Sequence, residues 1–175
     1  MDDPRYPIGK YAPPAEISTD LLATYLDELA LAPRRFAAAF AGLTPAQLET
    51  PYRDGGWTLR QVAHHLPDSH MNAYVRHKLT VTEDKPTILP YDENLWSKLG
   101  DVAQVEVDVS LRLLELVHVR WLAFLRALDP AAFARVFVHP EMGKEIRLDW
   151  SVGMYAWHGR HHTAHVTALR ERMGW

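Results

Sequence analysis

The chain has 175 residues, of which 47% are hydrophobic and 23% charged, with a formal net charge of -3. These values are ordinary for a folded protein, and the length favours one domain over residues 1–175. The small net charge argues against nucleic acid or an anionic membrane as a partner. The absence of cysteine excludes disulfides and thiol nucleophiles, whereas ten histidines are present. No apolar run reaches 18 residues and no signal peptide is evident, so we expect a cytoplasmic protein that does not span a membrane.

Apolar residues at helical spacing predict an all-α fold. Ser18 and Thr58 are good helix N-caps, and Thr58 begins the Thr-x-x-Gln pattern of a capping box. Pro33 should kink the first long helix. In chain order we expect a proline-rich extended arm over residues 1–17, a long helix over 18–42, a short turn at 44–45, a long helix over 59–81, a short helix over 92–99, a long helix over 111–128, a short turn at 129–130, a hairpin around 140–143 and a long helix over 149–173. These elements predict a four-helix bundle with a small β-hairpin.

Histidines on the predicted last helix form two pairs, His158 with His162 and His161 with His165. Residues four apart lie on one helical face, with Cβ atoms about 5–6 Å apart, so either pair can place two imidazoles on one cation. His158 continues the apolar track that includes Met154, which favours His158 and His162 as the inward pair. The pair His161 and His165 stays open as the alternative, because it has the same local geometry.

The predicted second helix supplies a third imidazole. His65 shares a face with Val62 and should point into the bundle, whereas His64 is turned about 100° away and is expected behind the site or in solvent. Three histidines with an open fourth position are typical of a catalytic metal site. Asp68, three residues after His65, could orient an imidazole through its free N–H. Arg76 is expected on the solvated face of this helix, with anion binding as its alternative role.

The histidine cluster also has an interpretation without catalysis. Histidines on a half-apolar helix face occur as hydrogen-bonded core residues or as pH-responsive groups. The chain would then be a non-catalytic metal-binding or dimerisation module. The two interpretations differ at the fourth coordination position, which a catalytic site keeps exchangeable.

The chain resembles the YfiT branch of the DinB/YfiT superfamily nearly end to end, in the segments YPIGKY, YRDGGWTLRQVAHHLPDSHMNAYVRHKL, PYDENLW and MYAWHGRHHTAHVTALRERMGW. The resemblance implies a bundle of unusual connectivity, a homodimer, and a divalent cation, zinc or nickel, on His65, His158 and His162. The chain departs from the family at Pro67, which should bend the second helix. It also departs at His165, where many relatives carry glutamine, so His165 is either polar support or an alternative ligand.

The resemblance further implies a small-molecule substrate and two possible reactions. In metal-dependent hydrolysis the cation activates water, although no general base is evident in the sequence. In S-transfer the cation holds the sulfur of a low-molecular-weight thiol, such as bacillithiol, mycothiol or glutathione, as a thiolate. A chain without cysteine must take that thiol from a cosubstrate. Asp68 and His165 are the candidates for supporting either reaction.

Overall fold

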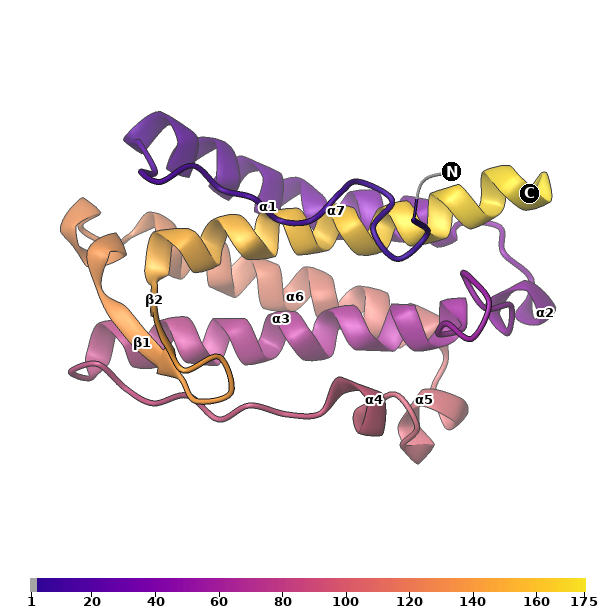
Figure 1. Cartoon of the computed structure of the whole chain (residues 1–175). Helices are drawn as coiled ribbons and strands as arrows, with labels where there is room; N and C mark the ends of the chain where they lie inside the picture. The colour runs from indigo at the N-terminus through magenta and orange to yellow at the C-terminus, as the bar shows by residue number, and fades with distance from the viewer. Residues whose placement is uncertain (1–2) are drawn as a thin grey trace.

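A computed structural model describes residues 3–175 and contains a bundle of four long helices (Figure 1). α1 packs against α6 and α7, and α3 packs against the same two helices. The expected mainly helical four-helix bundle is therefore confirmed. The long helices are α1 (Thr19–Phe40), α3 (Leu59–Thr82), α6 (Val107–Arg126) and α7 (Leu148–Met173).

Shorter elements fill the connections between the long helices. The expected hairpin is confirmed: its two strands are antiparallel, and Val136 lies opposite Arg147. A helix over residues 100–104 was not predicted, because its N-cap, Leu99, has no side-chain acceptor to signal a helix start. The short elements are α2 (Pro45–Leu48), α4 (Glu93–Trp96), α5 (Gly100–Gln104), η1 (Pro130–Ala134), β1 (Val136–His139) and β2 (Lys144–Arg147).

Local capping explains where the helices begin. Thr58 and Gln61 form the predicted capping box at the start of α3: Gln61 N donates to Thr58 Oγ1 (3.2 Å), and Thr58 N donates to Gln61 Oε1 (2.9 Å). In contrast, α6 begins at Val107, one turn earlier than predicted. Its N-cap Glu106 makes no side-chain capping bond, so the sequence carries no signal for this start. α1 and α3 continue without interruption through Pro33 and Pro67.

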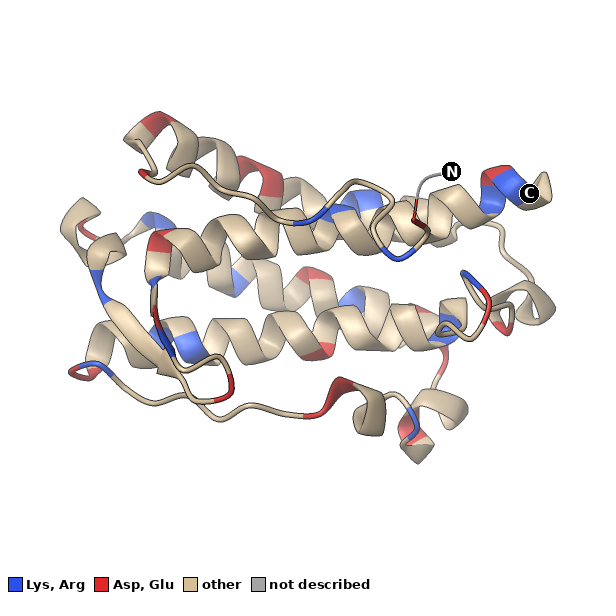
Figure 2. Cartoon of the chain, in the orientation of Figure 1, with Lys and Arg blue, Asp and Glu red and all other residues tan. Residues whose placement is uncertain are grey.

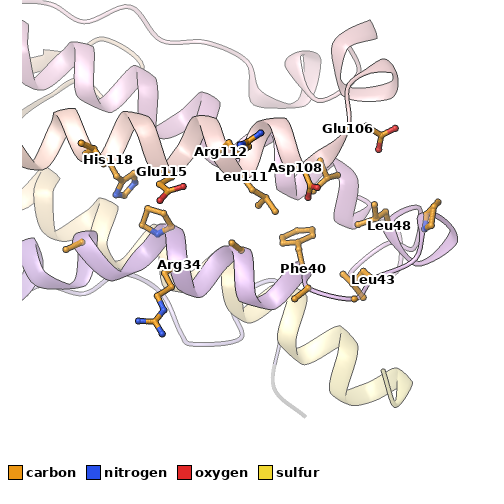
Figure 3. Close-up of a pocket in the computed structure, with 18 of the residues that line it drawn as sticks. Arg34, Phe40, Leu43, Leu48, Glu106, Asp108, Leu111, Arg112, Glu115 and His118 are labelled. Atoms are coloured by element: carbon orange, nitrogen blue, oxygen red, sulfur yellow. The ribbon is translucent and has the colours of Figure 1, made fainter.

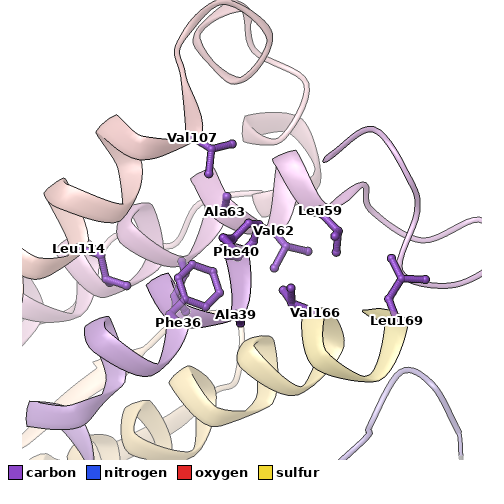
Figure 4. Packing of buried hydrophobic residues seen from close by; sticks show 11 residues of the cluster. Phe36, Ala39, Phe40, Leu59, Val62, Ala63, Val107, Leu114, Val166 and Leu169 are labelled. Carbon is purple, nitrogen blue, oxygen red and sulfur yellow. The ribbon is translucent and has the colours of Figure 1, made fainter. Parts of the chain in front are cut away.

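Two apolar clusters form the core of the bundle. On α3 the residues of the first cluster end at Leu66 and those of the second begin at Ala73, and on α7 the second cluster ends at Ala156 and the first resumes at Val166. All four histidines of α7 and His70 of α3 lie between these limits, and His65 lies beside Leu66 at the edge, so a polar layer separates the two apolar clusters. The first cluster (Figure 4) consists of Phe36, Ala39, Phe40, Leu59, Val62, Ala63, Leu66, Val107, Leu114, Val166 and Leu169.

The N-terminal arm runs alongside α1 and α7 (Figure 1). Residues 6–17 of the arm contain no helix or strand, as predicted. The Tyr11 hydroxyl donates to the carbonyl oxygen of Trp150 (3.1 Å), which fixes the arm to the first turn of α7. Gly153 permits this close approach, because a Cβ atom there would collide with the Tyr11 hydroxyl and the Tyr25 ring.

Charged residues of both signs are interspersed along the bundle (Figure 2). Across residues 3–175, no helix combines the length and the apolar character that crossing a bilayer requires.

Candidate metal centre

His65 on α3 converges with His158 and His162 on α7. One ligand nitrogen of each lies within 4.8 Å of the other two. The Nε2 atoms of His158 and His162 are 3.0 Å apart, and the His65 ring lies edge-on to both imidazoles. Two nitrogens bound tetrahedrally to one zinc ion at about 2.0–2.1 Å lie roughly 3.3 Å apart. The spacing therefore suits a shared cation.

A chain of hydrogen bonds leads from His158 to the backbone of α1. His118 Nδ1 lies 2.8 Å from the Leu29 carbonyl oxygen, His118 Nε2 lies 2.7 Å from His70 Nδ1, and His70 Nε2 lies 3.1 Å from His158 Nδ1. Pro33, which has no N–H, leaves the Leu29 carbonyl without its helical donor. That carbonyl can only accept, so each imidazole donates towards it, and His158 keeps a lone pair on Nε2.

A shorter chain holds His162 in the same tautomer. His162 Nδ1 lies 3.3 Å from His165 Nδ1, and His165 Nε2 lies 3.3 Å from the carbonyl oxygen of Arg5 in the N-terminal arm. With His165 donating to that carbonyl, His162 donates from Nδ1 and also keeps a lone pair on Nε2. Two lone pairs 3.0 Å apart repel each other unless a cation lies between them, so the tautomers fit a metal site.

Burial keeps the three imidazoles neutral. It lowers the pKa of His65 to about 4, with a smaller contribution from His165. Burial also lowers the pKa values of His158 and His162 well below the usual value, and the neighbouring imidazoles add to the effect. Neutral imidazole is the form that binds a metal ion, so no proton has to leave these side chains at pH 7.

Other histidines of the two helices lie outside this three-residue group. His161 stacks on Trp157, with ring centroids 4.4 Å apart. Its ring nitrogens do not belong to the group of ligand atoms that converges around His65. His64 is turned away from the three ligands as predicted, and of the two places expected for it, behind the site or in solvent, the structure excludes solvent. The His64 side chain is buried, and its Nδ1 lies 2.7 Å from the Ser110 hydroxyl on α6.

Asp68 lies apart from the three histidines. Among the described residues, no hydrogen bond joins its carboxylate to an imidazole, and it does not line the pocket that contains the cluster. Burial, followed by the charge of Asp101, raises the pKa of Asp68 to about 6. The orienting contacts come instead from His70 and His165.

The three histidines line a pocket of about 510 Å³. Trp57 packs edge-on against His65 (4.7 Å between ring centroids), and Tyr52 stacks on His165 (4.0 Å). Arg76 also lines this pocket and is half-buried, so its assignment to the solvated face of the helix is wrong. The segment after α3 folds back along the helix, and its Leu89 carbonyl accepts from Arg76 Nη2 (2.8 Å).

A larger groove of about 1000 Å³ lies between α1 and α6 (Figure 3). Charged side chains from both helices border it, including Arg34 and Glu115. Leu29, His118 and His70, whose hydrogen bonds lead to His158, form a relay. Of these residues His118 alone lines the groove, and both of its ring nitrogens already bond His70 and Leu29. The groove is therefore separate from the histidine cluster.

Residues 28–166 match the DinB superfamily. The chain belongs to the DinB superfamily. Its DinB relatives include a candidate metal-dependent hydrolase from Bacillus mycoides, 49% identical over 175 residues and all of both chains, and one from Bacillus cereus, 48% identical over the same coverage. The names of these DinB proteins, together with the histidine cluster, imply a metal ion.

Solved structures of similar proteins support the fold. The structure of YfiT from Bacillus subtilis, described as a candidate metal-dependent hydrolase with an unusual four-helix-bundle topology, superposes with a TM-score of 0.96 at 48% identity and covers 98% of each chain. A second four-helix bundle protein, TT2238, has a TM-score of 0.53 at 23% identity and covers 86% of this chain and 98% of its own. The second similarity concerns the fold alone.

Proposed function

We propose that this protein is a metal-dependent hydrolase of a small molecule, and that His65, His158 and His162 bind its cation, zinc or nickel. The observation that carries the proposal is the convergence of three neutral imidazole nitrogens within 4.8 Å in a pocket. Relatives with full-length similarity are named for the same activity. A divalent cation held by three imidazoles would act as a Lewis acid and make water nucleophilic at neutral pH.

The residues around the cluster orient the ligands and shape the substrate site. His70 and His165 hold the two ligands of α7 in the tautomer that presents Nε2. The pocket volume lies within the range of about 300–1000 Å³ that is typical of small-molecule sites. The Trp57 and Trp157 rings supply apolar walls.

S-transfer with a bacillithiol-like thiol is the second candidate, and the polar residues that line the pocket besides the histidines favour it. Besides the histidines, the lining includes Tyr52 and Arg53, which lie beside His165, and Arg76 and Tyr91, which lie beside each other. A pocket of this volume with both groups of residues can hold a thiol together with an electrophile. A homodimer and a cytoplasmic location stay predictions.

An activity screen of the metal-loaded protein distinguishes the two reactions. One arm uses 4-nitrophenyl esters without thiol, and the other uses 1-chloro-2,4-dinitrobenzene with bacillithiol or glutathione. Ester hydrolysis that depends on metal and is lost in His158→Ala is the expected result. The control is His64→Ala, which removes a histidine that faces away from the site.

The outcomes of this screen separate cleanly. Product formation that requires the thiol would show that the reaction is S-transfer and not hydrolysis. Turnover that survives both chelation and His158→Ala would contradict the metal mechanism altogether.

A further inference from the structure

The pocket contains a second polar group beside the histidine cluster. Arg76 comes from α3, Tyr91 from the segment between α3 and α4, and His139 from the end of β1. These three elements meet on the side of the pocket where Tyr155 packs edge-on against His158, with ring centroids 5.7 Å apart. The group is therefore next to the proposed metal ligands but separate from them.

Arg76 has no acidic partner among the described residues. Its Nη2 donates to the Leu89 carbonyl oxygen, its guanidinium lies 5.9 Å from the centre of the Tyr91 ring, and its buried Nε–H has no hydrogen-bond partner. The other arginines of the pocket are engaged differently: Arg5 pairs with Asp3, and Arg53 donates from Nε to the Tyr52 hydroxyl. Arg53 has no acidic partner either, but its Nε and Nη1 both have acceptors, so among the pocket arginines of the described chain Arg76 is the one with a buried donor left unpaired.

Unpaired donors accumulate in the same pocket. Within residues 3–175, four of the five buried side-chain nitrogens without a hydrogen-bond partner belong to its lining: Arg76 Nε, His139 Nδ1, Trp157 Nε1 and His161 Nδ1. The nitrogens of arginine and tryptophan can only donate, and imidazole can donate as well. A buried donor left without a partner is costly, so this lining is complementary to a molecule that brings acceptor oxygens.

The electrostatic effect of Arg76 on its neighbours agrees with an anion site. Burial lowers the pKa of His139, and the Arg76 charge lowers it further. Arg76 also opposes the upward shift that burial imposes on the pKa of Tyr155. The acidic side chains of the lining, Glu93 and Glu141, are exposed, and Asp68, whose charge acts on Tyr91, lies outside the lining, so no buried carboxylate of the lining neutralises Arg76.

We propose that Arg76, assisted by His139, binds an anionic oxygen group of the substrate, either a carboxylate or a phosphate. The inference deepens the proposed function and rests on it, because the other end of the same molecule would reach His65, His158 and His162. The Tyr155 side chain lies between the two subsites. The substrate class is therefore a small molecule whose anionic group is set back from the reacting bond.

The test follows the Arg76 Nε–H signal in ¹H–¹⁵N spectra of the zinc-loaded protein and of the chelated full-length chain. The probes are glutarate, inorganic phosphate and the uncharged glutaramide. Arg76 Nε–H should shift saturably with glutarate or phosphate in both protein forms and should not respond to glutaramide. Whichever anion saturates the signal at the lower concentration distinguishes a carboxylate from a phosphate substrate.

Calorimetric titration of variants measures the contribution of Arg76. Arg76→Met should weaken binding of the anion at least about tenfold, and Arg76→Lys, which keeps the charge without the planar pair of donors, should fall between it and the wild type. The matched control is Lys78→Met, which removes an exposed positive charge from the same helix outside the pocket.

Two results would overturn the anion subsite: equal binding of glutaramide and glutarate, or unchanged affinity in both Arg76 variants. If the wild-type protein binds the anion but takes up no zinc, the anion subsite stands and the proposed metal site is contradicted. Stoichiometric zinc without any response of Arg76 would reject the subsite alone.

Discussion

Replacing His70 with leucine should weaken metal binding, although His70 is not a proposed ligand. The His70 side chain is fully buried and joins His158 Nδ1 (3.1 Å) to His118 Nε2 (2.7 Å). Leucine has a similar volume but cannot hydrogen-bond. His158 would then lose the contact that holds its proton on Nδ1 and directs the Nε2 lone pair towards the cation.

The size of the effect follows from the two lost hydrogen bonds. Loss of a group that orients a metal-bound histidine typically weakens metal affinity 10–100-fold, so His70→Leu should fall in that range. Two buried nitrogens, on His158 and His118, also lose their partner. At about 1–3 kcal/mol each, they should lower the free energy of unfolding by roughly 2–6 kcal/mol.

Chelator competition measures the zinc affinity, and urea unfolding measures the stability. His70→Gln is the conservative comparison, because its amide can accept from His158 and donate to His118, and it should recover most of the affinity. His77→Leu is the matched control: His77 is also fully buried on α3, and it bonds Ser151 and Trp121 instead of a ligand. It should lose stability without losing affinity for zinc.

Wild-type zinc affinity in His70→Leu would refute the reasoning, as would equal losses in the leucine and glutamine variants. Long-range ¹H–¹⁵N spectra of the metal-free protein give an independent check. They should place the His158 proton on Nδ1 in the wild type and show a mixture of tautomers in His70→Leu.

Three further predictions concern the second relay, the pH dependence and the arm. His165→Gln should retain zinc within a few-fold of the wild type while His165→Ala loses about tenfold or more in the same chelator assay; equal losses would contradict a hydrogen-bonding role. His77 and His118 have pKa values lowered to about 3 and 4 by burial, so between pH 4 and 6.5 the unfolded chain binds more protons than the folded one. Each of these histidines should lower the free energy of unfolding of the metal-free protein by about 1.4 kcal/mol per pH unit as the pH falls through this window. A free energy of unfolding, measured with urea, that does not change with pH would contradict this prediction. Gly153→Ala should cost about 1–3 kcal/mol in thermal unfolding, because the new methyl group collides with Tyr11 and Tyr25; unchanged stability would show that the arm does not pack there.

The bundle could be predicted because local signals and periodicity agree along most of the chain. The predicted capping box at Thr58 marks a helix start that the structure contains. Where the N-cap carries no such signal, at Leu99 and Glu106, the prediction missed a helix or misplaced its start. The spacing of four indicated that His158 and His162 share a helical face, and the apolar track through Met154 favoured them over His161 and His165, which have the same spacing.

The relays and the anion site could not be predicted because they depend on contacts between distant segments. His118 is 48 residues from His70 and 89 from Leu29 along the chain. The available signals were a histidine in an apolar stripe and a proline that frees a helical carbonyl, and their connection depends on helix packing. Arg76 lines the pocket because the segment around Leu89 folds back over α3, which no local pattern indicates.

Metal content is the measurement that tests the central claim most directly. Untagged protein, purified without chelator or metal-affinity resin, should contain about one equivalent of zinc or nickel by elemental analysis. The single variants His65→Ala, His158→Ala and His162→Ala should each lose it, while His64→Ala should retain it. A wild-type protein that contains no metal and takes up no added zinc would contradict the account and leave the histidines as a hydrogen-bonded core network.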